Sequence, residues 1–164
     1  MMPLDAKIAE RLTTALAEGP QQTIAALNTL FCAVDGVRTV TWLATAPDYS
    51  VTHRIGTSDA EHFPLGGFDP IDDSAWNRRI FGDKRPVLGD DVPGMAAFIP
   101  ETDQLVAMGY GATGCFPIVI AGAVRGTVNV LGDAGLFTPA TLARITALLP
   151  LAALVFTFEG ISDR

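Results

Sequence analysis

The stretch FPIVIAGAVRGTVNVLG, from Phe116 to Gly132, constrains the fold of this chain more than any other part of the sequence. Two runs rich in β-branched residues flank a short Ala-Gly-Ala segment, and this pattern predicts a β-hairpin with strands over 114–120 and 124–131. Earlier in the chain, VRTVTWLA at 37–44 and YSVTHRIG at 49–56 predict a second hairpin, with the turn APDYS between them. The centre of the molecule is therefore expected to be an antiparallel sheet.

Apolar residues at helical spacing precede the first predicted strand. The first of two predicted helices covers about 4–18. An apolar residue recurs in it every four positions, at Leu4, Ile8, Leu12 and Leu16. Gly19 and Pro20 end this helix. A second helix is predicted over about 21–34, and the Asp35-Gly36 turn signal closes it.

A third long helix is predicted after the second hairpin, over about 139–158. Thr138 is its expected N-cap, with Pro139 in the first turn. Pro150 lies inside the predicted helix and is expected to bend it, because proline removes one backbone donor.

The segment between the hairpins, from 57 to 111, is too long to be a simple loop. Asp73 or Ser74 is expected to cap a short helix that carries Trp76 and Ile80 on one side. RPVLGDD predicts a short strand, and one or two short helices are expected over 93–108. The whole order predicts an α+β fold, with terminal helices on one face of the sheet and this excursion on the other.

Length and composition limit the number of domains and the classes of partner. A chain of 164 residues with 49% hydrophobic and 18% charged residues predicts a single folded domain over 1–164. The net charge of −7 disfavours nucleic acid and anionic membrane, because both need a basic surface. Two cysteines are too few for a disulfide framework, and no signal-peptide pattern stands at the N-terminus. The stretch LLPLAALVFTF at 148–158 is shorter than the ~20 residues that span a bilayer, so a cytoplasmic protein is expected.

Three segments in the right order resemble the GAF domain family. CFPIVIAGAVRGTVNVLG is similar to the family's late strand pair, with Pro117 and Gly126 at the marked positions. SAWNRRIFGDKRPVLGDD is similar to its G-x-x-x-P-V-x-x-x-D segment, which here matches Gly82, Pro86, Val87 and Asp90 or Asp91. LFTPATLARITALLPLAAL is similar to the closing helix. The resemblance implies a GAF-like, profilin- and PAS-related sheet of five or six strands, with a small-molecule pocket opposite the terminal helices.

Strand alternation selects the residues expected to face that pocket. Val128 and Val130 share the face that suits a helix-packed core, so Asn129 is predicted to face the pocket with its amide. The alternative is that Asn129 bonds the backbone of a neighbouring loop. Cys115 shares its parity with Thr113, and both are pocket candidates, although an inert buried thiol is also consistent with the pattern.

The remaining pocket candidates are aromatic or imidazole side chains. His53 lies on the apolar face of its strand with Tyr49, Val51 and Ile55, as a pocket-edge or core histidine. Flat apolar walls are expected from Trp42, Phe68, Trp76 and Tyr110. No His/Cys spacing typical of a metal site is present in the sequence, and no catalytic residue or cofactor is assigned.

Three functions remain open from the sequence. The first is a small-molecule sensor that acts as a homodimer, since the last helix is apolar around much of its circumference. The second is a redox enzyme that resembles the free methionine-R-sulfoxide reductases of the GAF family. That branch needs several cysteines and late-strand carboxylates, whereas Thr113 and Asn129 stand on the corresponding strands here. The third is an interaction module with no pocket.

Overall fold

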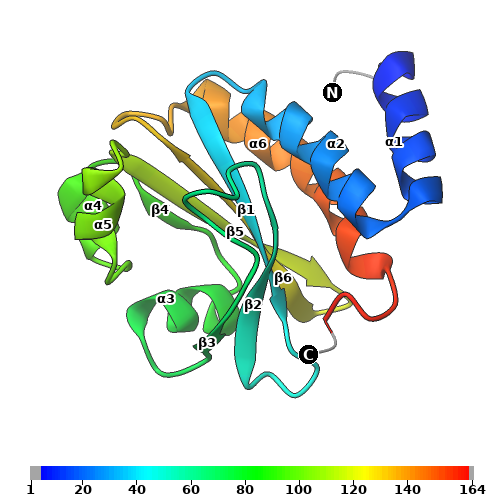
Figure 1. The fold of residues 1–164 in the computed structure, drawn as a ribbon. Helices are drawn as coiled ribbons and strands as arrows, with labels where there is room; N and C mark the ends of the chain where they lie inside the picture. The colour runs from blue at the N-terminus through cyan, green and yellow to red at the C-terminus, as the bar shows by residue number, and fades with distance from the viewer. Residues whose placement is uncertain (1–4, 163–164) are drawn as a thin grey trace.

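The computed structural model describes residues 5–162 and shows a single six-stranded antiparallel sheet among them (Figure 1). The strands are β1 (Val37–Thr45), β2 (Val51–Thr57), β3 (Gly66–Pro70), β4 (Val87–Gly89), β5 (Ala112–Ile120) and β6 (Ala123–Gly132). Their order across the sheet is β3-β2-β1-β6-β5-β4. The two predicted hairpins are β1–β2 and β5–β6, and they meet where β1 pairs with β6.

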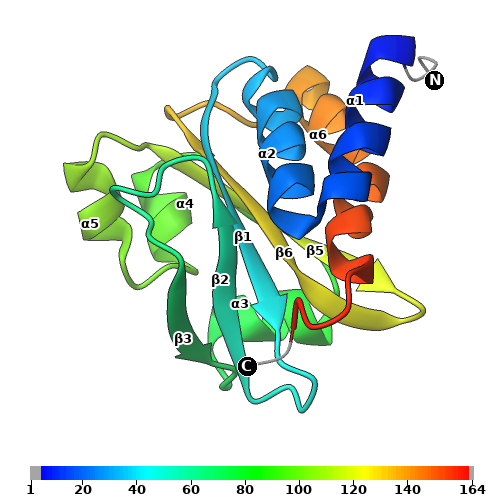
Figure 2. The ribbon, with the colours of Figure 1, turned by 45° about the vertical axis from the view of Figure 1, so that its right-hand side comes forward.

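The long helices cover one face of the sheet. They are α1 (Ala6–Glu18), α2 (Pro20–Cys32) and α6 (Pro139–Ala152), and α6 continues as a 3₁₀ turn, η2 (Ala153–Thr157). Figures 1 and 2 show α2 and α6 against the sheet, with α1 packed outside α2. Asp5 caps α1 by accepting from the Lys7 backbone N–H, and Thr138 caps α6 as predicted. Leu4, placed at the start of the first predicted helix, lies outside the described residues.

The excursion covers the opposite face. It contains α3 (Ala75–Asn77), a π-helical turn η1 (Arg78–Gly82), α4 (Val92–Ala96) and α5 (Thr102–Ala107), which lie across the sheet from the long helices in Figure 1. Ser74, not Asp73, caps α3 by accepting from the Asn77 backbone N–H. The edge strand β3 was not predicted, because Gly66 and Gly67 have positive φ and all five of its residues are exposed.

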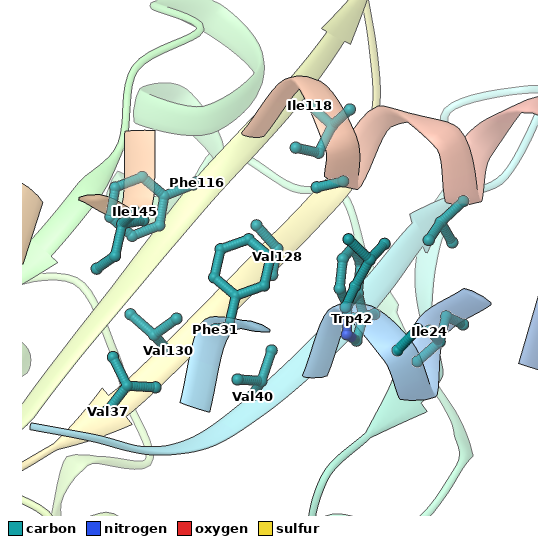
Figure 3. Packing of buried hydrophobic residues seen from close by; sticks show 14 of the residues in the cluster. Ile24, Phe31, Val37, Val40, Trp42, Phe116, Ile118, Val128, Val130 and Ile145 are labelled. Atoms are coloured by element: carbon teal, nitrogen blue, oxygen red, sulfur yellow. The ribbon is translucent and has the colours of Figure 1, made fainter. Parts of the chain in front are cut away.

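The helix-facing side of the sheet carries the main hydrophobic core. Figure 3 shows Trp42 and Val40 from β1 and Val128 from β6 around Phe31 of α2. In the same view Phe116 from β5 lies by Ile145 of α6, and both belong to the same core. The β1–β6 register pairs Trp42 with Val128, which confirms that the valine face of β6 points toward the helices. Alternation then turns the intervening residues, including Thr41 and Asn129, to the other side.

The structure explains why glycine stands at position 126 and why proline is tolerated at position 117 of the GAF-like strand pair. A Cβ on Gly126 would lie 2.1 Å from the Leu43 carbonyl oxygen and 2.4 Å from the Phe156 ring, so only glycine fits this approach of backbone and ring. Pro117 lies beyond the stretch of β5 that pairs with β4, which ends at Cys115. A missing N–H is tolerated there because one edge of β5 has no strand neighbour among the described residues.

The segment from Pro139 to Thr157 is more apolar than a surface helix usually is. It runs for 19 residues with a mean hydropathy of 1.7, and 28% of its most apolar window is buried. By length and composition alone it is therefore long enough to cross a bilayer, a test that core helices of soluble proteins also pass. The α-helix continues past Pro150 to Ala152 before it tightens into η2, because this proline falls in its last turn.

Candidate ligand pocket

A cavity of about 540 Å³ lies between the sheet and the excursion. This volume is within the range of known small-molecule sites, roughly 300–1,000 Å³. Four adjacent strands form its floor, with Thr41 and Leu43 from β1, Thr52 and Arg54 from β2, Thr113 and Cys115 from β5, and Asn129 and Leu131 from β6. The walls come from the excursion, at residues 62–63, 69–77 and 98–108.

Four of the eight predicted pocket residues line this cavity. Thr113, Cys115 and Asn129 lie on its floor, and Trp76 contributes from α3. The sheet register pairs Cys115 with Asn129 directly across β5 and β6. The parity argument therefore placed the strand residues on the correct face.

Asn129 is 7% exposed and bonds a neighbouring strand rather than a loop backbone. Its Nδ2 donates to Oγ1 of Thr41 over 3.2 Å. Its Oδ1 is buried and accepts from no group within residues 5–162. The amide thus carries one bond that fixes it and one acceptor that the protein leaves unused.

Cys115 is buried on the cavity floor and is a poor nucleophile. Burial raises the pKa of its thiol to about 11, and a hydrogen bond with the Trp76 side chain lowers it by less. At neutral pH the group is therefore a neutral thiol rather than a reactive thiolate. Cys32 packs against the core on the helix side of the sheet, so the two thiols are on opposite faces.

Trp42 does not line the cavity, contrary to the sequence prediction. It is fully buried on the helix side, and its indole Nε1 donates to Oδ1 of Asn28 over 2.7 Å. The prediction was wrong because it assigned Trp42 to the pocket wall as an aromatic residue and did not apply strand alternation to it. Trp42 pairs with Val128 and therefore points to the same side as that valine.

His53 and Phe68 also lie on the side of the sheet away from the cavity. His53 pairs with Ala44, a residue of the helix-side core, and its ring lies 5.6 Å from that of Phe68. The apolar face of β2 was correctly recognised, but it packs toward the helices rather than the pocket. Phe68 itself is 55% exposed on the edge strand.

Tyr110 lies behind the cavity wall. It packs in a small cluster with Phe63, Leu105 and Leu131, three residues that do line the cavity. Its hydroxyl is 2.5 Å from Oγ1 of Thr39, and the Arg38 guanidinium lies over its ring at 4.8 Å. Tyr110 therefore supports the wall without lining it.

Arg54 is the main site residue that sequence reasoning missed. Its Nη1 donates to the carbonyl oxygen of Pro64 over 3.1 Å, and its guanidinium carbon lies 5.6 Å from the Phe63 ring centre. Its Nε is buried and has no acceptor among the described residues. The available signal was its shared parity with Thr52, a second residue of the cavity floor.

Three exposed carboxylates line the cavity, from Asp69, Asp72 and Glu101. Asp72 accepts from the Ser74 backbone N–H and from Nδ2 of Asn77, and these bonds hold the pKa of its carboxyl below its usual range. Turn and cap chemistry therefore accounts for Asp72, whereas the two motif aspartates after β4 have one tertiary contact and one cap. Asp90 accepts from the Phe137 backbone N–H, and Asp91 caps α4.

No group of three or more metal-ligating side chains is found between residues 5 and 162. A smaller cavity of about 310 Å³ lies at the other end of β1, beside the 156–162 segment, and none of the eight predicted residues lines it. The larger cavity is therefore the candidate site.

The sequence matches no family model and no curated protein. Solved structures show the fold. The GAF domain of a two-component sensor histidine kinase from Bacillus halodurans aligns with a TM-score of 0.68 at 11% identity, over 82% of this chain and 91% of that one. The GAF domain of an Acinetobacter phosphoenolpyruvate-protein phosphotransferase aligns at 0.66 and 10% identity over 100% of both chains. A segment of a methyl-accepting chemotaxis protein aligns at 0.67 and 16% identity, over 93% of this chain and 97% of that one. The protein has the GAF domain fold.

Proposed function

From this GAF fold and the cavity on its open sheet face, we propose that the protein is a sensory or regulatory domain that binds a small molecule. The cavity between the sheet and the excursion, about 540 Å³ in volume, is the observation that carries the proposal. Its walls mix apolar side chains, such as Trp76 and Phe98, with polar ones, and most side chains on its floor are polar, so the cavity offers both apolar surface and hydrogen-bonding groups to a small molecule. Proteins of the same fold in a sensor kinase and a chemotaxis protein add support at the level of fold only.

The decisive experiment blocks the cavity and measures binding. Leu43 is half-buried on β1 and lines the cavity, so Leu43→Trp places an indole in the space that a ligand would occupy. Leu65→Trp makes the same substitution at a site that is 54% exposed and outside the cavity. Native mass spectrometry of freshly purified protein, followed by thermal-shift screening of metabolites, measures binding for both variants and the parent.

We expect the parent and Leu65→Trp to bind the same molecule, and Leu43→Trp to lose it while remaining folded. A bound mass that all three proteins retain equally would place the ligand elsewhere. If the parent showed no bound mass and no metabolite stabilised it, the alternative of an interaction module would be favoured, because such a module does not need the cavity.

Homodimerisation is the second part of the proposal, and it is supported by the apolar surface of α6. Leu148 and Leu151 lie three residues apart on one face of α6 and are only half-buried against the core of this chain. Covering such a stripe with a second copy would remove it from water. Sedimentation of the parent and of Leu148→Glu measures the dimer, and a monomer at high micromolar concentration contradicts it. Flotation with lipid vesicles tests whether the same stripe binds a bilayer instead.

A cytoplasmic location and a non-enzymatic role complete the proposal. Both cysteines are free, which suits a reducing compartment. The redox alternative is disfavoured by the raised pKa of Cys115 and by the position of Cys32 on the opposite face of the sheet. If Cys115→Ser abolished a measured reductase activity, that alternative would be restored.

A further inference from the structure

The larger cavity and the smaller cavity beside residues 156–162 share one wall of packed side chains. This wall is a cluster of four buried residues, with three aromatic side chains packed against it: Ile80, Val87, Cys115 and Val124, with Trp76, Phe81 and Phe98. Trp76 and Cys115 line the larger cavity, whereas Val124 lines the smaller one. Because protein interiors are close-packed, a side chain that shifts on one side of this wall displaces its neighbours toward the other side.

Three aromatic rings in contact run across this wall. The Trp76 ring centre lies 6.3 Å from that of Phe81, and the Phe81 ring centre lies 6.4 Å from that of Tyr49. Both pairs meet edge to face, at distances where aromatic rings attract each other. Tyr49 belongs to the turn between β1 and β2 and lines the smaller cavity. The three rings therefore connect the larger cavity with the smaller one.

The two ends of this row of rings differ in how firmly they are held. At one end, a hydrogen bond joins the Trp76 side chain to Cys115 on the floor of the larger cavity. At the other end, Tyr49 faces a cavity whose further lining includes residues 157–162, all of which are exposed or half-buried. Figures 1 and 2 show this last segment beside the β1–β2 turn. Few buried contacts fix residues 157–162, so they are the part of this lining that changes position most easily.

The backbone that carries Phe81 and Tyr49 is held in unusual conformations. Phe81 lies in the π-helical turn η1, where the Asp83 N–H donates to the Arg78 carbonyl over 3.0 Å. Such turns are rare and occur frequently at functional sites. Tyr49 has a φ of 58°, in the left-handed region that a β-carbon disfavours. Strained backbone persists only while its surroundings fix it, so both positions are expected to rearrange when the packing around Phe81 changes.

We propose that Trp76, Phe81 and Tyr49 form a coupling path that transmits the state of the larger cavity to residues 157–162. A ligand in the larger cavity contacts Trp76 and fixes its ring, and Phe81 passes the change to Tyr49. The segment after η2 is then the place where this fold reports binding. The coupling rests on the proposed function for its ligand, but the path itself belongs to the chain and is tested without a ligand.

Hydrogen exchange of residues 157–162, measured by mass spectrometry on the full chain, tests the path. Trp76→Leu removes the ring at the cavity end, and exchange at 157–162 should rise by roughly two- to tenfold, the contribution of one aromatic pair. Phe98→Leu is the matched control, because Phe98 is half-buried in the same cluster and lines the same cavity but lies outside the path. It should leave this exchange unchanged, and equal increases in the two variants overturn the proposal.

A second substitution, Phe81→Leu, distinguishes coupling from general loosening. In this background the path is already cut, so adding Trp76→Leu should leave exchange at 157–162 unchanged. An increase as large as that in the parent background overturns the proposal, because the effect then does not pass through Phe81. Exchange of the buried residues Val40 and Val128 reports global unfolding. If Trp76→Leu raises it, Trp76→Phe repeats the test with a smaller change.

A coupling between two sites is reciprocal, so the path can also be tested from its far end. Labelling with 5-fluorotryptophan gives one fluorine NMR resonance for each of the two tryptophans, Trp42 and Trp76. Tyr49→Leu should shift the Trp76 resonance in the parent but not in the Phe81→Leu background, although Tyr49 does not line the larger cavity. Phe68→Leu removes another exposed aromatic ring and should not shift it. A Trp76 resonance that Tyr49→Leu leaves in place overturns the proposal.

Failure of the coupling and failure of the proposed function give different results. Exchange at 157–162 that does not respond to Trp76→Leu overturns the coupling, and ligand binding is then still decided by Leu43→Trp. A parent protein that binds no small molecule removes the proposed function, whereas the exchange and NMR measurements would still show whether the two cavities are coupled.

Discussion

Replacing Trp42 with phenylalanine should destabilise the fold without changing the ligand pocket. The indole of Trp42 is fully buried between α2 and the sheet, with the Phe31 ring at 5.9 Å and the Phe156 ring at 6.4 Å. Its Nε1 donates to Oδ1 of Asn28, whose Nδ2 in turn donates to the Thr57 carbonyl. The bond thus ties α2 to both β1 and β2.

Two costs add in Trp42→Phe. The smaller ring leaves roughly 40 Å³ unfilled, which at ~24 cal/mol per Å³ of cavity costs about 1 kcal/mol. Oδ1 of Asn28 is left buried without a donor, which costs about 1–3 kcal/mol. The free energy of unfolding should therefore fall by about 2–4 kcal/mol, and the melting temperature by roughly 5–15 °C for a domain of this size.

Urea denaturation followed by far-UV circular dichroism measures this loss without relying on tryptophan fluorescence. The same substitution made in an Asn28→Leu background should cost less, because no acceptor remains to be stranded. The reasoning is refuted if Trp42→Phe stays within about 0.5 kcal/mol of the parent, the range of a neutral surface change. It is also refuted if the loss is the same in both backgrounds.

Two further predictions test the sheet and the cavity floor. The thiol of Cys115 ionises from a pKa of 9.0 in the unfolded chain but from about 11 in the folded protein, so stability should fall as pH rises through this window. Denaturation midpoints of Cys115→Ser should show a shallower fall than those of the parent or of Cys32→Ser, and identical slopes would contradict the assignment. Gly126→Ala should abolish folded expression, because its Cβ would overlap the Leu43 carbonyl, whereas Gly82→Ala meets no atom within 4 Å and should fold normally. Circular dichroism of both variants checks this, and a stable Gly126→Ala protein would show that the backbone can move apart.

Periodicity and strand parity determined much of this protein from the sequence. Four residues of the late hairpin, Val128, Asn129, Val130 and Cys115, lie on the faces that alternation assigned to them. Alternation fixes a face because successive side chains of a strand point to opposite sides whatever the rest of the fold does. The helix caps at Thr138 and Ser74 could also be predicted from the sequence, because an N-cap bonds only to the backbone of residues next to it in the chain.

Only the tertiary structure decided which residues meet in the cavity. His53 and Arg54 are adjacent in sequence, yet the pairing of Ala44 with His53 sends the histidine toward the helices and leaves Arg54 on the cavity side. A strand pattern shows that two faces differ, but it does not say which layer covers which face. Pairing partners on neighbouring strands settle that question, and so does the path of the excursion. That Nε of Arg54 and Oδ1 of Asn129 have no hydrogen-bond partner among residues 5–162 likewise became visible only in the tertiary structure.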